Sequence, residues 1–355
     1  MRILLMVKRF QFGGAENHVC ELANALTAEG HNVWLLTGTG FQKCRLHPAI
    51  QHHVVRFSDL KLIFHLWYLV RLIRKERIEV IHAHQRFPIF LGTLAANLGK
   101  IPIVATVHGS PVTDLKTEFV RNRVDRVIAI RQSCYDRLKE SPVLESKVVL
   151  IPNGINLPVK QVVRKTASHC FSLFYISRLD KHHAQLLRFF LKEVWPEMIR
   201  RYPDSILHIV GDGTGFKQIK QFWRGSKFKP YRETVRLDGY CANVADLFQH
   251  ADLVMGAGRV AIESLVNGVP LLSLKYNHLG PVTDRANLKK MQYANFVDLD
   301  ASPPDQNEML GTLTDFIVRR EYFENEAKEL QLKMRLEYDL DQIVKGICGV
   351  YKEVI

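Results

Sequence analysis

A glycine-containing turn in the second half of the sequence joins an apolar run to a helical pattern. The apolar run 253–255 is followed by Gly-Ala-Gly at 256–258 and then by Arg259. Glycines at such a turn let a ligand approach the backbone, and the free N–H groups at the start of a helix bind anions. Arg259 adds a positive charge, and Glu263, one turn further on, has acceptor oxygens suited to vicinal ribose hydroxyls. The pattern is suited to holding a nucleoside diphosphate.

Other strand-like runs also end in glycines, cations or polar side chains, and the carboxyl ends of parallel strands form the ligand-binding edge of a sheet. Fixed cations and N–H dipoles at that edge can stabilise a leaving diphosphate. The residues predicted to act in catalysis are His108, Arg178, Lys181 and Glu263. The ligand that carries the diphosphate is called the donor, and the residues predicted to bind it are Gly13, Gly14, Gly211, Asp212, Tyr240, Gly256, Gly258, Arg259, Val260 and Glu263. The second substrate is called the acceptor, and the residues predicted on its side are Glu16 and His108.

Each of these features also has a purely structural interpretation. A glycine pair can form a plain tight turn, and Arg178 or Lys181 can form a surface salt bridge. His108 can be a buried histidine whose hydrogen bonds are satisfied below the site. His82 and His84 are more typical of structural histidines and are left out of the predicted site. The fingerprint G-x-G-x-x-G is absent, which argues against a nicotinamide or flavin enzyme.

Short runs rich in valine, isoleucine and leucine alternate with amphipathic segments in both halves of the chain. This alternation predicts a doubly wound, mostly parallel sheet in each half. Residues 156–170 lose the periodicity, so two α/β domains joined by a linker and facing across a cleft are expected. The predicted strands are 2–7, 32–37, 80–83, 103–107, 126–129, 148–151, 172–176, 205–210, 235–237, 253–255 and 270–273, and the predicted helices are 15–30, 61–77, 87–98, 131–140, 184–201, 215–224, 243–250, 260–267 and 305–350.

The positive charge of the 355-residue chain is concentrated in its first half. The net charge is +13, and residues 1–165 hold 24 Lys and Arg against 12 Asp and Glu. A basic half attracts anionic partners, such as phosphate-bearing substrates or an anionic membrane surface. Nucleic acid is not expected, because no reading motif is present. Residues 60–77 combine aliphatic and aromatic residues with cations at their C-terminal end. Two interpretations stay open: this helix covers a sheet, or it also faces a membrane.

Targeting signals and cysteine usage favour a cytoplasmic protein. No apolar stretch reaches the roughly 18 residues of a membrane span, and the N-terminus has no small-residue cleavage site. The six cysteines are scattered without a C-x-x-C pair, so neither a disulfide framework nor a zinc site is expected. The expected location is the cytoplasm, and the membrane-facing interpretation of residues 60–77 adds peripheral attachment to the cytoplasmic face of the inner membrane.

The order and spacing of several short motifs resemble a known family. They read GGAE, LANALTAEGHNV, IHAH, TVHG, VIAIRQSC, IPNGIN, ISRLDK, HIVGDG, LDGY and ADLVMGAGRVAIESLVNGVPLL. In this order the chain resembles the family 4 retaining glycosyltransferases from residue 1 to about residue 300. The resemblance implies the GT-B fold. It places a Rossmann-like acceptor-side domain at 1–160, a Rossmann-like nucleotide-sugar domain at 161–330, and a C-terminal helix at 331–355 that packs back on the first domain.

The same resemblance implies an activity. It indicates a metal-independent enzyme that moves a hexose from a nucleotide diphosphate, with retention, to a growing cell-surface glycan or glycolipid such as lipopolysaccharide or capsule. The expected donor is a UDP-sugar, which is a co-substrate, and no cofactor is expected. The resemblance also favours same-face attack, in which the departing phosphate takes the acceptor proton, and no carboxylate stands out as a covalent nucleophile.

Two positions depart from the family pattern. The family commonly has a glutamate eight residues before the one matching Glu263, and this chain has Met255 there. The family's lysine five residues after the matching arginine is replaced by His183, and Lys181 lies nearby. The backbone at 256–260 is expected to supply some of the missing donor contacts. A non-catalytic nucleotide-sugar binder is therefore a second hypothesis, and a nucleotide-sugar epimerase is a third.

Overall fold

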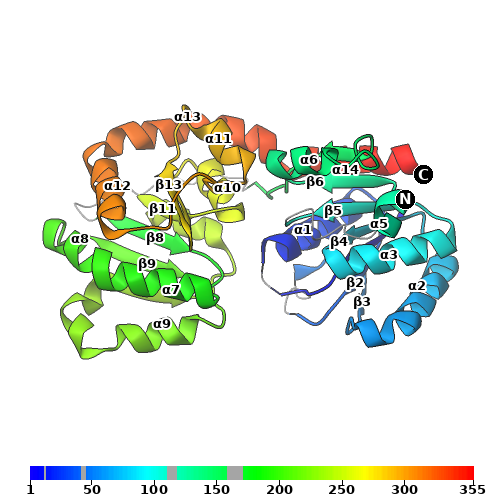
Figure 1. The fold of residues 1–355 in the computed structure, drawn as a ribbon, viewed down its shortest axis with the longest axis horizontal. Helices are drawn as coiled ribbons and strands as arrows, with labels where there is room; N and C mark the ends of the chain where they lie inside the picture. The colour runs from blue at the N-terminus through cyan, green and yellow to red at the C-terminus, as the bar shows by residue number, and fades with distance from the viewer. Residues whose placement is uncertain (12, 41–44, 110–117, 158–170) are drawn as a thin grey trace. The chain divides into compact units, whose positions relative to one another are not determined.

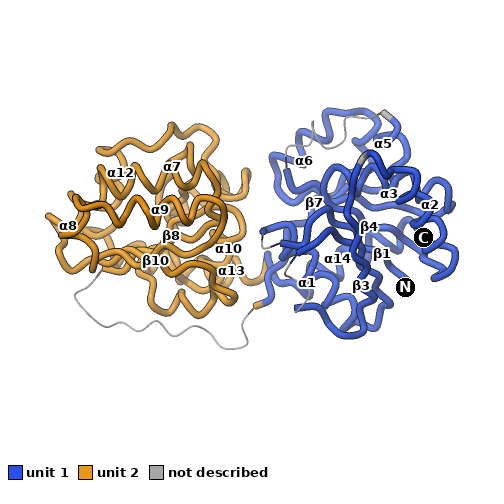
Figure 2. The backbone as a smooth tube through the Cα atoms, turned by 90° about the horizontal axis from the view of Figure 1, so that it is seen from below, with its two compact units in different colours: residues 1–156, 338–355 blue, residues 157–337 orange. Residues whose placement is uncertain are grey.

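The computed structural model describes residues 1–11, 13–40, 45–109, 118–157 and 171–355. Two compact units make up the chain, shown in blue and orange in Figure 2. Unit 1 comprises Met1–Asn156 and Tyr338–Ile355, and unit 2 comprises Leu157–Glu337. The sequence placed these divisions at 160/161 and 330/331. Most of the predicted linker, 156–170, lies outside the described residues.

Unit 1 is built on a seven-stranded parallel sheet in the order β3-β2-β1-β4-β5-β6-β7. Its inner strands are apolar on both faces because helices cover both sides, as doubly wound sheets require (Figure 1). The strands are β1 (Arg2–Val7), β2 (Asn32–Thr37), β3 (Gln51–Val54), β4 (Val80–His84), β5 (Ile103–Val107), β6 (Arg126–Ala129) and β7 (Val148–Leu150). The helices are α1 (Gly14–Ala28), η2 (Asp59–Lys61), α2 (Leu62–Glu76), α3 (Arg86–Gly99), α5 (Glu118–Arg123), α6 (Gln132–Lys139) and α14 (Leu340–Val354).

The C-terminal helix α14 is part of the core of unit 1. Val344, Ile347 and Tyr351 are buried with the strand residues of one sheet face. The Tyr351 hydroxyl lies 2.6 Å from Nδ1 of His82 in β4. The chain returns through a parallel bridge between Ile155 and Asp339. Residues from the end of the chain thus complete a layer that the first half leaves open.

Unit 2 is built on a six-stranded sheet in the order β10-β9-β8-β11-β12-β13, parallel except for the edge strand β13. The strands are β8 (Ser172–Ile176), β9 (Ile206–Val210), β10 (Val235–Gly239), β11 (Leu253–Gly256), β12 (Leu271–Lys275) and β13 (His278–Val282). The helices are α7 (Lys181–Phe189), η3 (Phe190–Val194), α8 (Trp195–Arg201), α9 (Phe216–Trp223), η4 (Ser226–Thr234), η5 (Val244–His250), α10 (Arg259–Val266), α11 (Leu288–Tyr293), α12 (Gln306–Val318) and α13 (Arg320–Tyr338).

Two edge strands were not predicted from the sequence. The strand β3 has the sequence QHHV and no buried residue, so it lacks the apolar signature of a parallel strand. The strand β13 contains Gly280 and Pro281, which are poor strand formers but are tolerated at a sheet edge. Edge strands take part in fewer packing contacts, so their sequences carry a weaker signal.

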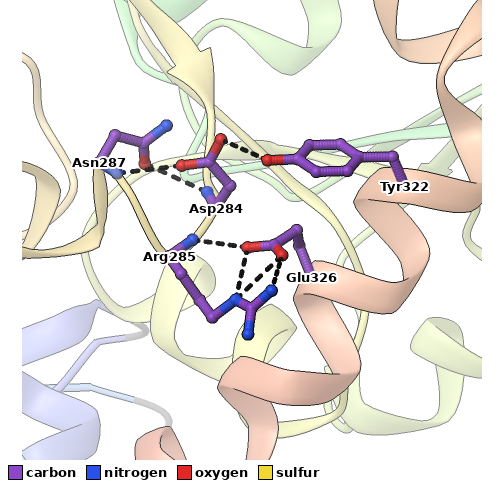
Figure 3. Close-up of polar contacts among 5 residues, drawn as sticks. All are labelled: Asp284, Arg285, Asn287, Tyr322 and Glu326. Carbon is purple, nitrogen blue, oxygen red and sulfur yellow. Dashed lines mark hydrogen bonds and ion pairs between the residues drawn. The ribbon is translucent and has the colours of Figure 1, made fainter.

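A polar cluster in unit 2 ties α13 to the loop that follows β13 (Figure 3). The Arg285 guanidinium donates to both oxygens of Glu326, with the shortest distance 2.6 Å, and the Arg285 backbone N–H donates to the same carboxylate. These hydrogen bonds lower the pKa of the buried Glu326. Beside this pair, Asp284 accepts from the backbone N–H of Asn287 and from the Tyr322 hydroxyl. The cluster fixes α13 on the sheet.

No helix within the described residues is both long enough and apolar enough to cross a membrane.

Candidate active site

The carboxyl ends of four adjacent strands in unit 2, β10, β9, β8 and β11, carry all the predicted donor-binding residues of that unit. Backbone hydrogen bonds join the turns that follow these strands. The Gly211 N–H donates to the Gly239 carbonyl over 2.7 Å, and the Leu179 N–H donates to the Asp212 carbonyl over 3.0 Å. The topology therefore brings residues that are far apart in sequence to one edge of the sheet.

The turn between β11 and α10 holds the predicted Arg259 and Glu263 against each other. Arg259 Nε donates to Glu263 Oε1 over 2.7 Å, and the two side chains are 14% and 19% exposed. Residues four apart on a helix face each other, so this pair fixes both side chains beside the turn. Gly258 has φ of +65°, and its N–H donates to the Asn295 carbonyl. The donors left for an anion are the N–H groups of the first turn of α10, which have no partner inside the helix.

Gly211, at the end of β9, permits a close approach between two turns. Its φ is +135°, and a Cβ atom there would lie 1.8 Å from the Ser177 carbonyl oxygen. No side chain fits this space without moving the backbone. The glycine therefore keeps the turn after β9 packed against the turn after β8.

Replacing Gly211 with alanine is expected to destabilise unit 2 by about 3 kcal/mol or more, because backbone strain and a backbone clash add. The matched control is Gly311→Ala in α12, where a new Cβ meets nothing within 4 Å. That change should stabilise the helix by about 0.5–1 kcal/mol. Chemical denaturation of the full chain measures both effects. A Gly211→Ala variant as stable as the parent would contradict this description of the turn.

The turn between β8 and α7 carries the other predicted cations of unit 2. Asp180 caps α7 by accepting from the backbone N–H groups of His182 and His183. Arg178 is 67% exposed and lies 4.0 Å from Asp180, which makes a weak surface pair. Lys181 is exposed at the first residue of α7. Both cations lie at the carboxyl edge, and their predicted contact with a diphosphate stays a prediction.

His183 and Met255, the two departures from the family pattern, are both turned to structural contacts. His183 Nδ1 lies 2.7 Å from Ser177 Oγ and 2.9 Å from the Tyr175 hydroxyl, and burial lowers the pKa of its imidazole. Met255 is fully buried in the core of unit 2. Neither His183 nor Met255 therefore supplies a charged group at this edge.

The predicted donor-binding residue Tyr240 follows β10 and is 44% exposed.

The second group of predicted residues lies at the carboxyl edge of β1, β4 and β5 in unit 1. Gly13 is the N-cap of α1, and the Glu16 carboxylate folds back over it. Gln85, after β4, donates to Glu16 over 3.1 Å and accepts from the Lys8 N–H over 3.1 Å. Gln85 has φ of +69°, which is strained for a non-glycine residue. Sequence reasoning missed Gln85, and no pattern around it signals this conformation.

The buried His18 and His84 form a cluster with the half-buried His108. His84 Nδ1 lies 3.0 Å from His108 Nε2, and the ring of His18 lies edge-on to both, with centroids 5.8 and 5.7 Å away. His82 contacts Tyr351 and Thr106, so it is structural, as expected. His84, by contrast, contacts the predicted site residue directly. Leaving it out of the site missed this contact, which the alternation of His-Ala-His along β4 could have indicated.

Burial keeps this histidine cluster neutral. It lowers the pKa of His82 to about 3 and that of His108 to about 4, and it holds the pKa of His84 well below its usual range. Because both rings are neutral, one of the two nitrogens, His84 Nδ1 or His108 Nε2, carries a hydrogen and donates it to the other. The other ring nitrogens, His84 Nε2 and His108 Nδ1, are buried and have no hydrogen-bond partner among the described residues. Leaving a buried polar atom without a hydrogen-bond partner lowers the stability of the folded protein by about 1–3 kcal/mol. A ligand that hydrogen-bonds to either ring nitrogen would recover this free energy as binding energy.

The buried histidines should make unit 1 acid-sensitive. Unfolded histidine binds a proton below about pH 6.5, whereas His82, His84 and His108 stay neutral in the folded protein. The free energy of unfolding should therefore fall by several kcal/mol as the pH drops from about 6.5 to about 4.5. Thermal unfolding followed across this range measures the loss. His84→Gln should reduce the slope, and the exposed His250→Gln should not. A flat profile would show that these rings are not buried and neutral.

Comparison with known proteins shows which families and structures the chain is similar to. Residues 12–158 match the family model described as Glycosyltransferase Family 4. This match covers less than half of the chain. An Escherichia coli UDP-Gal:alpha-D-GlcNAc-diphosphoundecaprenol alpha-1,3-galactosyltransferase is 23% identical over 66% of this chain and 63% of its own length. An Acholeplasma laidlawii alpha-monoglucosyldiacylglycerol synthase is 25% identical over 73% of this chain and 76% of its own length.

Solved glycosyltransferase structures share the fold. Anabaena Alr3699/HepE in complex with UDP and glucose aligns with a TM-score of 0.73 at 16% identity, covering 99% of both chains. A glycosyltransferase from Rickettsia africae aligns with a TM-score of 0.75 at 15% identity, covering 99% of this chain and 98% of its own. The fold class expected from the sequence, two Rossmann-like domains of the GT-B glycosyltransferases, is confirmed.

Proposed function

We propose that the protein transfers a hexose from a UDP-sugar, with retention of configuration, to a glycan or lipid-linked acceptor. The observation that carries this proposal is the Arg259–Glu263 pair at the turn after β11. The pair puts a cation and a carboxylate beside the free N–H groups of a helix start, a combination suited to a diphosphate and a ribose. The match of residues 12–158 to Glycosyltransferase Family 4 and the similarity to two sugar-transferring enzymes support the same reaction class.

In the proposed reaction the bond between the anomeric carbon and the β-phosphate oxygen breaks, and a bond from the acceptor oxygen to that carbon forms on the same face. The departing phosphate takes the acceptor proton. Arg259, Arg178 and Lys181 stabilise the negative charge that develops on the diphosphate, together with the N–H groups of α10. Glu263 holds the ribose after exchanging its contact with Arg259 for the sugar hydroxyls. In unit 1, His108 with its neutral ring is the residue proposed to contact the sugar or the acceptor.

A non-catalytic donor-binding protein is the alternative. It is favoured by the burial of Met255 and by the contacts that hold His183 away from a charged role. Such a protein would bind UDP and UDP-sugars but release no UDP over time. A nucleotide-sugar epimerase, the third hypothesis, would convert the sugar without an acceptor.

The deciding experiment measures UDP release from a panel of UDP-sugars, with and without soluble glycan and lipid-linked acceptors. Proton NMR of the product gives the configuration at the new bond. Acceptor-dependent UDP release with a retained configuration supports the proposal. Tight UDP binding without turnover favours the binding protein, and conversion of the sugar without acceptor favours the epimerase. An inverted product would contradict retention.

We also propose that the acceptor lies at the cytoplasmic face of the inner membrane, as part of lipopolysaccharide, capsule or a similar glycolipid. The support is the basic first half of the chain and the two relatives whose names specify lipid substrates. Fractionation of cells that express the full chain tests this: recovery with inner membranes, released by high salt, supports it. Recovery in the soluble fraction at low salt would contradict peripheral attachment.

A further inference from the structure

The outward face of α2 in unit 1 is apolar over its first half. Leu60, Ile63, Phe64 and Trp67 are 98%, 84%, 62% and 58% exposed. Leu60 lies in η2, directly before α2, and the spacing of Ile63, Phe64 and Trp67 at i, i+1 and i+4 keeps these three on one side of α2. A surface helix of a soluble protein normally presents polar residues on this side, so a contiguous patch of large apolar side chains indicates a binding surface.

The opposite face of α2 performs the structural task. Leu69, Leu72 and Ile73 are buried, and α2 lies beside α3 (Figure 1). The first interpretation of residues 60–77, a helix that covers the sheet layer, therefore holds for this face, and the other face has no partner among the described residues. The exposed residues do not serve the core of unit 1.

The same stripe becomes basic over the second half of α2. Arg71 and Arg74 are exposed and form no ion pair with a carboxylate among the described residues, and Lys75 pairs only with the adjacent Glu76. The Arg71 guanidinium lies 5.7 Å from the centre of the Trp67 ring. A surface hollow of about 490 Å³ is lined by Trp67, Val70, Arg71, Arg74 and Lys75.

We propose that this stripe, residues 60, 63, 64, 67, 71, 74 and 75, is a docking site for an anionic phospholipid bilayer. Phe64 and Trp67 enter the interface between head groups and acyl chains, where tryptophan is favoured. The hollow beside Trp67 receives a lipid phosphate, which Arg71 and Arg74 contact with planar guanidinium groups. The cations match the negative surface potential of the cytoplasmic leaflet.

Charge argues against a second copy of this chain as the occupant. A symmetric dimer built on this stripe would bury Arg71 and Arg74 against a copy of the same residues, which include no carboxylate to neutralise them. An anionic bilayer neutralises the same arginines. The docking site assigns residues to the membrane attachment that the proposed function includes, and its test does not depend on sugar transfer.

Vesicle flotation of the full chain tests the docking site, with phosphatidylcholine vesicles that contain or lack phosphatidylglycerol. Removing two cations by R71Q/R74Q should weaken binding to the anionic vesicles about 25-fold and binding to neutral vesicles little, from roughly fivefold per cation. The double change F64Q/W67Q should weaken binding to both kinds about 100-fold, because the inserted apolar surface is lost. High salt should reproduce the effect of R71Q/R74Q.

Matched controls keep folding and the proposed activity separate from docking. The changes R137Q/K139Q on α6 remove two other exposed cations, and L98Q removes another exposed apolar side chain; both should leave vesicle binding unchanged. All variants should keep the unfolding temperature and the UDP affinity of the parent. If the parent itself fails to bind UDP, the proposed function is wrong, and the vesicle assay still tests the docking site. Equal vesicle binding by the parent and both stripe variants would overturn the docking site. A concentration-dependent dimer abolished by F64Q/W67Q, without vesicle binding, would overturn it as well.

Discussion

Glu263→Gln is expected to lower kcat/KM for a UDP-sugar by about 100-fold or more. A hydrogen bond to a charged group contributes about 1.5–3 kcal/mol, and the carboxylate is proposed to accept from two ribose hydroxyls. The amide keeps the shape of the side chain but loses its charge, and it removes the ion pair between Glu263 and the largely buried Arg259. UDP affinity, measured by titration calorimetry, should fall together with turnover, because the ribose is bound both before and during the reaction.

The chain offers a close control for this variant. Glu324 also pairs with an arginine four residues earlier, Arg320, over 2.9 Å, and its side chain is also 19% exposed. Glu324→Gln removes an equivalent ion pair away from the carboxyl edge, so its UDP affinity and turnover should match the parent. If both glutamines reduce activity equally, Glu263 acts through stability and its proposed contact with ribose is wrong.

His108→Ala is expected to lower kcat by about 100-fold while changing UDP affinity little. A single preorganised hydrogen-bonding group in an active site commonly contributes 10²–10³ to the rate. His108 contacts the site through a neutral ring, since burial lowers its pKa to about 4. The parent's rate should therefore show no titration of this histidine between about pH 6 and 8. As the pH falls toward 4, the ring becomes protonated and the rate should drop.

His84→Gln separates positioning from direct contact. If His84 orients the ring of His108 through the 3.0 Å contact, its loss should lower kcat by a smaller factor, roughly 10-fold, and leave the flat pH profile intact. If the rate of the parent instead falls as the pH rises through about 6.5, the working form of His108 is charged. A fully active His108→Ala variant would remove the histidine from the site.

Much of the site was predictable because its residues follow strands directly. Arg178, Gly211 and Arg259 each come after a short apolar run, and the parallel topology brings such positions to one edge. The pairing of Arg259 with Glu263 also had a local signal, their spacing of four residues on a helix. The division between inner strands and helices followed from the same periodicities.

What could not be predicted depends on contacts between distant segments. Gln85 joins β1 to α1 through two hydrogen bonds, and its positive φ results from that packing. The neutral state of His84 and His108 comes from burial by surrounding elements, including α1. The inward turn of His183 toward Tyr175 is likewise a tertiary contact, so composition around Lys181 could not reveal it.

The most direct test of the central claim is an experimental structure of the protein with UDP bound. We expect the diphosphate against the first turn of α10, within reach of Arg259, and the ribose hydroxyls on Glu263 in place of part of its present contact with Arg259. UDP bound elsewhere, with the Arg259–Glu263 pair undisturbed and distant from the nucleotide, would contradict the account.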